Sequence, residues 1–540
     1  MDGTKRVDFI SKLPFDIVME NIIPRIMGQK GRSFNLRYQW NYFAVCTTWS
    51  TRIAASDTSI HFHVESNKLT SKQDWRRVEA VACCIKTATV TAYSLEALFD
   101  LIQYAHFPSL NNLTITVTGF QAQWVTLLQL IPNVKCLQVE FKMQGRPIQL
   151  LDMLCQCPRL WHLKISWDSP FCFTFGTQCK LLFPTLRYLE VSNGPLSNPI
   201  IQNILPLFPG LHVLRLAVHI KRYEHFEKIR YYCPNLQQLL LWSRNEESAT
   251  TNALLQHDHG EGCRSVSIRQ VPFRGDCIAR FLKENSATVE SFELLKYSPC
   301  TPPILTFVND PVSLDRLRSL RYDRNLQRPE MKVIEWIVLR APNIEFVDVT
   351  DGGVLGIILH ALIHQRIRGI TLVSSGPSNS VEEYEFLEHH AQLGVNSSLQ
   401  EMKCNIYESF SGGGDWLHLI PKLQQLKSLE LSLLRDNNLG LLTKLVPLVA
   451  RGCISLEKIT FNVLSFSSFG DWLLPLSQHP HLRSLLIASD MVSNDTLMTL
   501  QRFRHLESLH LKLNSFDWKA IDRLKNDMPC LVCTIQKANQ

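Results

Sequence analysis

Three groups of side chains have the types and spacing that could bind a metal ion. Cys530 and Cys533 form a C-x-x-C pair, and His257-Asp258-His259 and His389-His390 place imidazoles side by side. A structural zinc site needs four ligands, and none of these groups has a second set at zinc-site spacing. We therefore interpret the cysteines as packing residues and the histidines as parts of solvated loops, and we expect no metal.

Motifs for phosphate, nucleotide or nucleophile chemistry are also missing. The sequence has no G-x-x-x-x-G-K-[ST], no H-E-x-x-H and no G-x-S-x-G, and no G-x-G-x-x-G follows a strand pattern. The glycine run from Gly412 to Gly414 lacks the lysine and the hydroxyl residue of a phosphate loop. The sequence therefore predicts a protein that is not an enzyme and that has no cofactor.

Composition narrows the class of protein. The chain has 540 residues, of which 45% are hydrophobic and 19% charged, so it can bury a large core. The formal charge of +7 is small for this length, and we expect no nucleic-acid partner. The longest nearly apolar run, 354–363, is about half a membrane span, no signal-type segment is present, and the cysteines form no disulfide framework. We expect a cytoplasmic or nuclear protein with no membrane partner.

The elements that position any site come from an internal repeat. Pro108-x-Leu110-x-x-Leu113-x-Ile115 returns at Pro132, Pro158, Pro184 and further downstream with the same offsets. Its central apolar residue recurs about every 26 residues, which is the period of a leucine-rich repeat. The sixteen positions are Leu113, Leu137, Leu163, Leu189, Leu214, Leu239, Val266, Phe292, Leu320, Val347, Ile370, Met402, Leu429, Ile459, Leu485 and Leu509.

Each repeat predicts a helix, a turn and a strand. The final L-x-L alternates with period two, as in a strand, whereas helical spacing precedes the proline in 124–130, 148–154 and 333–339. We expect an α/β leucine-rich-repeat solenoid over 107–540, with parallel strands inside, helices outside, about sixteen units and a C-terminal cap. Cys157 and Cys233 take an apolar slot before the proline and should be buried. Residues 58–106 read as a linker and a degenerate capping repeat.

One interval is longer than the others. Between Ile370 and Met402 the chain carries a Ser/Gly/Pro-rich run followed by the acidic stretch 382–385. We interpret 374–395 as an insertion loop on the solenoid. Either a tolerated surface loop or a lid over a binding site fits this pattern.

The N-terminal segment, residues 8–57, does not share the repeat. Leu13-Pro14 opens an amphipathic helical pattern, and a second helical pattern contains Val45-Cys46-Thr47-Thr48-Trp49. Both patterns are short, so they indicate a small all-α domain. The apolar residues that define the two patterns are Leu13, Pro14, Ile17, Val18, Ile22, Val45, Cys46 and Trp49.

This ordered pair of motifs resembles the F-box, and the chain as a whole resembles the F-box proteins of the leucine-rich-repeat group. The resemblance implies that the box docks on the Skp-type adaptor of a cullin–RING ubiquitin ligase, and that the repeats hold a protein substrate. The eight apolar residues named above would then form or support the adaptor-binding face. Packing within the box is the alternative role for each of them, because a domain this small needs some apolar residues for its own core.

The residue between the two apolar positions of each strand should point into the concave face. This stripe mixes charges, which suits a protein surface better than a polyanion track. Leu240 and Trp242 look like exposed anchors, and reversing the charges of Arg215 and Arg321 should weaken capture without loss of stability. The expected substrate-binding residues are Arg215, Leu240, Trp242, Glu293, Arg321 and Asp348.

Three functions remain open from the sequence. The first is the substrate-recognition subunit of an SCF-type (Skp–cullin–F-box) ubiquitin ligase, and the second is a leucine-rich interaction scaffold without a role in ubiquitination. The third is a nucleic-acid-binding solenoid, which would need a basic surface that the strand stripe does not provide.

Overall fold

A computed structural model forms two compact units, residues 1–263 and 264–540. The described residues are 61–65, 86–92, 107–117, 128–129, 131–141, 148–149, 154–167, 173–174, 182–192, 202, 204–217, 224–242, 262–269, 275–295, 312–323, 328–350, 354–374, 380–406, 415–433, 439–463, 470–491, 494–515, 523–524, 526–528 and 531–537.

The first unit contains a parallel sheet with eight described strands. Each strand pairs with the next one along the chain, so the sheet grows by one strand per repeat. The strands are β1 (His61–Glu65), β2 (Thr87–Ala92), β3 (Asn112–Val117), β4 (Cys136–Phe141), β6 (His162–Trp167), β8 (Tyr188–Ser192), β9 (Val213–Ala217) and β10 (Gln238–Trp242). The other described elements are the short pair β5 (Ile148–Gln149) and β7 (Phe173–Thr174), η4 (Leu205–Leu207) and α10 (Glu224–Tyr232).

The second unit continues the pattern with eleven described parallel strands. They are β11 (Ser265–Arg269), β12 (Ser291–Leu295), β13 (Ser319–Asp323), β14 (Phe346–Thr350), β15 (Gly369–Ser374), β16 (Glu401–Ile406), β17 (Ser428–Leu433), β18 (Lys458–Val463), β19 (Ser484–Met491), β20 (Ser508–Ser515) and β21 (Val532–Lys537). The helices are α11 (Gly275–Glu284), α12 (Arg328–Arg340), α13 (Gly356–Leu362), α14 (Ser380–Leu393), η6 (Gly394–Asn396), η7 (Asp415–Lys422), α15 (Leu439–Gly452), α16 (Gly470–Ser477) and α17 (Asn494–Leu500). None of the helices in these described ranges is long and apolar enough to span a membrane.

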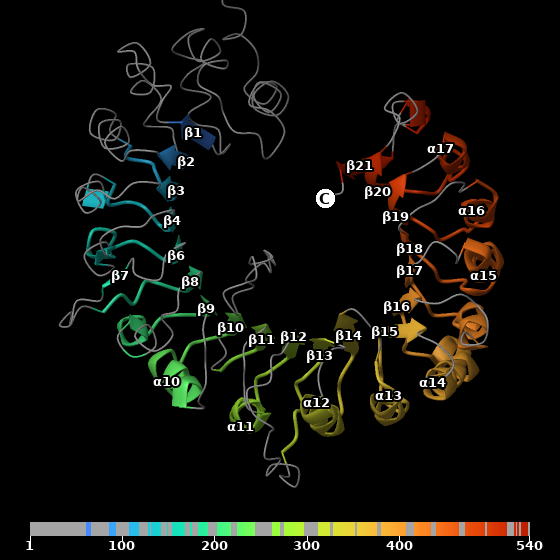
Figure 1. Cartoon of the computed structure of the whole chain (residues 1–540), viewed down its shortest axis with the longest axis horizontal. Helices are drawn as coiled ribbons and strands as arrows, with labels where there is room; N and C mark the ends of the chain where they lie inside the picture. The colour runs from blue at the N-terminus through green and yellow to red at the C-terminus, as the bar shows by residue number, and fades with distance from the viewer. Residues whose placement is uncertain are drawn as a thin grey trace, which may run out of the picture. The chain divides into compact units, whose positions relative to one another are not determined.

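The repeat positions set the register of both sheets. All sixteen stand second in their strands, and each is at most 3% exposed. Within each unit they pair with one another, as Leu163 does with Leu189 and Leu429 with Ile459. In each unit the strands line the concave side and the helices lie outside them (Figure 1). The predicted leucine-rich-repeat solenoid is therefore confirmed.

The turns before the strands tie consecutive repeats together. The amide of Asn133 donates to the carbonyl of Pro108, and Asn235 makes the same bond to Pro209 in a later repeat. Cys157 and Cys233 fill the apolar slot at the turn and are 2% and 1% exposed, as predicted. Because their thiols are buried, the pKa of each is raised to about 12.

Two local predictions are wrong. The expected insertion loop 374–395 contains the regular helix α14, which packs between α13 and η7, so this stretch is the outer helix of a longer repeat. The predicted helix at 148–154 begins instead with strand β5.

The proposed N-terminal box, 8–57, lies outside the described residues, as do Cys530 and His257-Asp258-His259. In the expected linker, strands β1 and β2 add two positions to the sheet ahead of Leu113. Their alternating sequences, HFHVE and TATVTA, carry the period-two signal that marks the strands further along.

Candidate functional site

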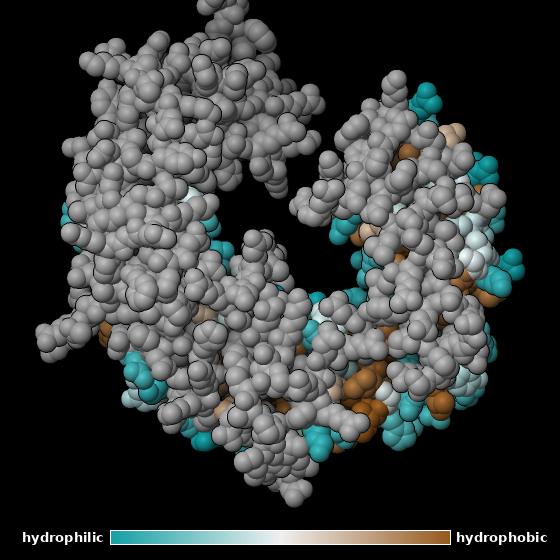
Figure 2. Space-filling view, in the orientation of Figure 1, coloured by the Kyte–Doolittle hydropathy of each residue, from teal (hydrophilic) through white to brown (hydrophobic). Residues whose placement is uncertain are grey.

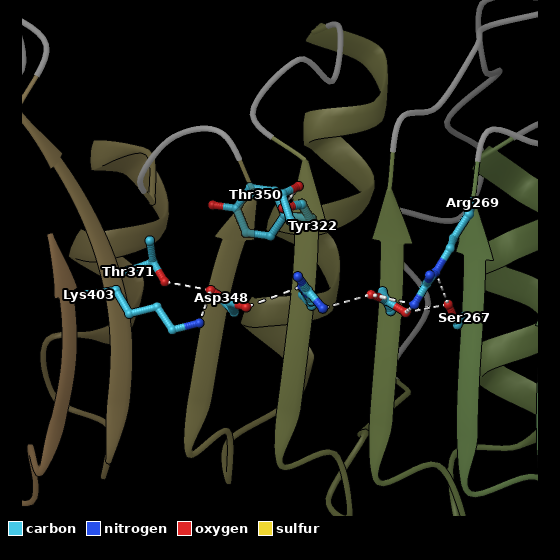
Figure 3. Close-up of polar contacts among 9 residues, drawn as sticks. Ser267, Arg269, Tyr322, Asp348, Thr350, Thr371 and Lys403 are labelled. Carbon is cyan, nitrogen blue, oxygen red and sulfur yellow. Dashed lines mark hydrogen bonds and ion pairs between the residues drawn. The ribbon is translucent and has the colours of Figure 1, made fainter. Parts of the chain in front are cut away.

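In the second unit, side chains on the concave face form a continuous chain of polar contacts. Ser267, Glu293, Arg321 and Asp348 stand in register on β11 to β14, at the position between the two apolar residues of each strand. Thr371 and Lys403 follow on β15 and β16 (Figure 3). Because each strand adds one such residue, neighbours in this row are about 4.8 Å apart along the sheet.

Glu293 is the first acidic centre of this row. Its carboxylate accepts from the Ser267 hydroxyl and lies 3.0 Å from Nη2 of Arg269 and 3.3 Å from Nη1 of Arg321. Glu293 and Arg269 are 13% and 12% exposed, so water screens their attraction less than at an open surface. The three partners hold the carboxylate in one position.

Asp348 is the second centre. Its Oδ2 lies 3.2 Å from Nε of Arg321, and its Oδ1 accepts from Thr371 at 2.7 Å and lies 3.3 Å from Nζ of Lys403. Burial works to raise the pKa of this carboxyl, but Lys403, the Thr371 hydrogen bond and Arg321 outweigh it, and the net shift is downward. Asp348 is therefore charged at neutral pH, and Arg321 joins the two centres.

Glu190 is such a centre among the described residues of the first unit, and it is 1% exposed. Nζ of Lys164 lies 2.9 Å from Oε1, Nη1 of Arg215 lies 3.6 Å from Oε2, and the Tyr188 hydroxyl donates to Oε2 at 2.5 Å. Burial opposes ionisation here, yet the hydrogen bonds from Tyr188 and Lys164 and the two cations lower the pKa of Glu190. Arg215 is thus part of a buried network, so reversing its charge would not leave stability unchanged, and that expectation is corrected.

Aromatic rings stand beside this centre. The rings of His162 and Tyr188 are stacked with centroids 3.9 Å apart, and the Arg215 guanidinium lies 5.4 Å from the centroid of Tyr188. Trp161 meets His162 edge to face at 5.6 Å and is 37% exposed. Burial lowers the pKa of His162 to about 4, so this ring is neutral at physiological pH.

The sequence-based anchor is not at the surface. Trp242 is 2% exposed, which contradicts the prediction that it offers an exposed ring, and Leu240 beside it is only partly exposed. The alternation of the strand predicts the face on which a side chain lies, but it does not predict how deeply that face is covered. Of the six expected substrate-binding residues, the structure brings Glu293, Arg321 and Asp348 together. Arg215 forms an ion pair with Glu190 instead.

Helix α14 carries two buried ionisable residues that sequence reasoning placed in solvent. Glu383 is 2% exposed, and burial, helped by the neighbouring Glu382, raises its pKa to about 7 against its own backbone hydrogen bond. His390 is 1% exposed, its Nδ1 lies 3.0 Å from the Ser397 hydroxyl, and burial together with His389 lowers its pKa to about 4. In the folded protein His390 is therefore neutral at neutral pH, and Glu383 keeps its proton to a higher pH than an exposed glutamate does.

Replacing Glu383 by glutamine should change how stability depends on pH. The raised pKa means that the folded protein holds a proton that the unfolded chain releases above about pH 4.5, so stability falls as pH rises to about 7. We expect the variant to lack this loss and to gain on the order of 2 kcal/mol over the native protein between pH 5 and pH 8. Urea unfolding at the two pH values measures it. Below about pH 6.5 the buried His390 changes stability with pH in the opposite direction, so the decisive range is about pH 6.5 to 8. A Glu383→Gln variant whose free energy of unfolding changes over this range as much as that of the native protein would contradict the prediction.

No cluster of three or more metal-ligating side chains occurs among the residues that the structure describes. Cys533 is partly exposed on β21.

A second row of charges was missed by sequence reasoning. The residues directly before the strands form a row that we call the rim row. In the second unit its members are Arg264, Glu290, Arg318, Glu345, Arg368, Gln400, Lys427, Glu457, Arg483 and Glu507. Each backbone N–H donates to the carbonyl of the preceding member at 2.7–2.9 Å, so the row is continuous. Signs alternate along it, and Glu345 pairs with both Arg318 and Arg368. In the sequence this row could have been found as the residues that stand two places before each of the repeat positions Val266 to Leu509.

No family model matches the chain, and no curated protein matches it. Several solved structures do. A leucine-rich-repeat protein of Leptospira interrogans is 10% identical, with 90% of this chain and 98% of that chain covered and a TM-score of 0.27. TLR13 in complex with ssRNA13 is 12% identical (84% and 58% covered, TM-score 0.34), and the Toll–Spatzle complex of Drosophila is 11% identical (88% and 60% covered, TM-score 0.39). At these scores the matches carry no argument about what this chain binds.

Proposed function

We propose that this chain is the substrate-recognition subunit of an SCF-type ubiquitin ligase in the cytoplasm or nucleus. The N-terminal box would bind a Skp-type adaptor and, through it, a cullin. The solenoid would hold a protein substrate on its concave face. The chain would do no chemistry itself and would act by bringing the substrate close to the ligase's catalytic subunits.

The observation that supports protein binding by the solenoid is the row of charges in the second unit. Glu293, Arg321 and Asp348 are held by contacts of 2.7 to 3.3 Å, and their signs alternate along the sheet. Such a row presents donors and acceptors at about 4.8 Å intervals with little freedom left to lose on binding. Alternating signs suit a protein surface of complementary charge, which favours specificity and orientation.

The ligase role is supported by the sequence motif alone. Leu13-Pro14 and Val45-Cys46-x-x-Trp49 stand in the order and at the place expected of a box ahead of a leucine-rich solenoid. The specific alternative is an interaction scaffold that binds partners without delivering them for ubiquitination. The two functions differ in one measurable product, ubiquitin conjugated to the captured partner.

The double substitution Leu13→Ala and Trp49→Ala should abolish binding of the adaptor while the solenoid stays folded. Truncating two apolar side chains in one docking face removes several kcal/mol of binding energy. The full-length variant is tested by co-purification with purified Skp-type adaptor and cullin, followed by a ubiquitination assay on the partners that the native chain captures.

A matched control removes the same kind of side chain elsewhere. Ile357 on α13 is 59% exposed and Leu339 on α12 is 60% exposed, and Figure 2 shows hydrophobic colour around this part of the helical side. Ile357→Ala with Leu339→Ala should leave adaptor binding unchanged. Adaptor binding at native levels by the Leu13/Trp49 variant would refute the box. Adaptor binding by the native chain without ubiquitination of its partners would establish the scaffold instead.

A further inference from the structure

The rim row of the first unit differs from that of the second in its charge. Its members are Lys86, Asn111, Lys135, Trp161, Arg187, His212 and Gln237. The backbone N–H of each donates to the carbonyl of the preceding one at 2.8–2.9 Å, so these residues stand side by side, one per strand. Three are cations and none is a carboxylate, whereas basic and acidic residues alternate in the second unit.

The centre of this row consists of an exposed tryptophan between two exposed cations. Lys135, Trp161 and Arg187 stand directly before the consecutive strands β4, β6 and β8, and all three are exposed. Among the described residues, neither Lys135 nor Arg187 has a carboxylate within ion-pair distance. In the second unit the equivalent cations Arg318 and Arg368 are both paired with Glu345.

Arg187 contacts a histidine in place of an acidic partner. Nδ1 of His212 lies 2.7 Å from the carbonyl oxygen of Gly210, which makes Nδ1 the protonated nitrogen. Nε2 then has a free lone pair and accepts from Nη1 of Arg187 at 3.4 Å. The His212 ring therefore orients the guanidinium, which keeps further donors for a ligand.

We infer that an acidic segment of a partner protein binds across Lys135, Trp161 and Arg187. The two cations are two strand spacings apart, about 10 Å, which matches carboxylates three residues apart on a peptide in the polyproline II conformation, where every third side chain returns to the same face at a rise of about 3.1 Å per residue. Between them the exposed indole would contact an apolar side chain of the same segment. The inference deepens the proposed function, because it names the chemistry of the segment that the solenoid would capture.

A protein segment fits this surface better than a nucleic acid. Stacking of successive bases needs several open aromatic faces, but His162 and Tyr188 are stacked on each other at 3.9 Å, which leaves Trp161 as the exposed ring of this cluster. The cations Lys164 and Arg215, on the strands that follow Trp161 and His212, are already engaged with Glu190. Two available cations neutralise two carboxylates, whereas a nucleic-acid strand presents a longer run of phosphates.

The test uses the full-length chain and a labelled twelve-residue peptide with glutamate at every third position and leucine or serine between. A peptide with glutamine in place of glutamate and a single-stranded oligo-uridine of equal length are the comparison probes. Fluorescence anisotropy at low salt should detect the acidic peptide only. Lys135→Glu with Arg187→Glu should weaken its affinity at least about tenfold, and Trp161→Ala by about threefold or more.

The control variant, Lys422→Glu with Lys444→Glu, makes the same change of net charge on the helical side of the second unit, and it should bind normally. Equal weakening in both charge variants would overturn the site, as would a Trp161→Ala variant that binds at full strength. Tighter binding of oligo-uridine than of peptide would assign the surface to nucleic acid instead. Adaptor co-purification, measured on the same variants, should be unchanged, so failure of the box and failure of this surface are distinguishable.

Discussion

Replacing Glu190 by alanine should lower the free energy of unfolding of the first unit by about 3–5 kcal/mol. The carboxylate is 1% exposed and lies against Lys164, Arg215 and the Tyr188 hydroxyl. Removing it leaves two cations, 19% and 14% exposed, without their counter-charge, and it leaves the phenol without its acceptor. The loss is large because the desolvation cost of these groups stays while the attraction that offset it is gone.

Urea unfolding followed by tryptophan fluorescence measures this loss. The control is the triple variant Glu190→Leu, Lys164→Met and Arg215→Met, which replaces the whole cluster by apolar side chains and should recover most of the stability. Because the folded-state pKa of Glu190 is lowered, its contribution is complete above the unfolded pKa and is lost as pH falls through the folded value. An alanine variant as stable as the native chain at neutral pH would show that the cluster contributes nothing.

The solenoid was predictable because its signal is repeated. Every repeat position from Leu113 to Leu509 carries the same offsets, and an apolar residue at that place is buried by its neighbours in the adjacent repeats. The same alternation predicted which residues of each strand point into the concave face. Glu293, Arg321 and Asp348 were therefore identified as neighbours from spacing alone, and the structure places them in register.

The predictions that failed concerned how deeply a side chain is buried, and not the face of the sheet to which it belongs. Strand parity assigns Trp242 and Glu190 to the concave face, yet both are almost fully buried, because burial on a curved inner face depends on the surrounding side chains and not on strand parity. The helix α14 was mistaken for a loop because a Ser/Gly/Pro-rich run precedes it. The spacing Ser380-x-x-Glu383 at its start is that of a capping box and could have indicated the helix.

Replacing Gly452 by alanine should destabilise the second unit by at least about 2 kcal/mol. Gly452 is the last residue of α15, and a Cβ atom there would stand 2.0 Å from the carbonyl oxygen of Pro421 in the preceding repeat. The contact is with backbone, so the two repeats would have to move apart. Gly210 in the first unit would place its Cβ 2.2 Å from the carbonyl oxygen of Pro184, so a glycine permits the same close approach between repeats there.

Gly440→Ala is the matched control, because it makes the same chemical change in the same helix with no atom within 4 Å of the new Cβ. Alanine favours a helix over glycine by about 1 kcal/mol, so this variant should be neutral or slightly more stable. Urea unfolding of both variants gives the comparison, and equal stability of the two would mean that the repeats can separate at little cost. The ladder hydrogen bonds set the spacing of the strands that carry Asp348, Lys403 and the other charges on the concave face. If Gly452→Ala is destabilised as expected, close backbone contact at the turns also holds neighbouring repeats at a fixed distance. The charged row would then be a template whose intervals the partner has to match.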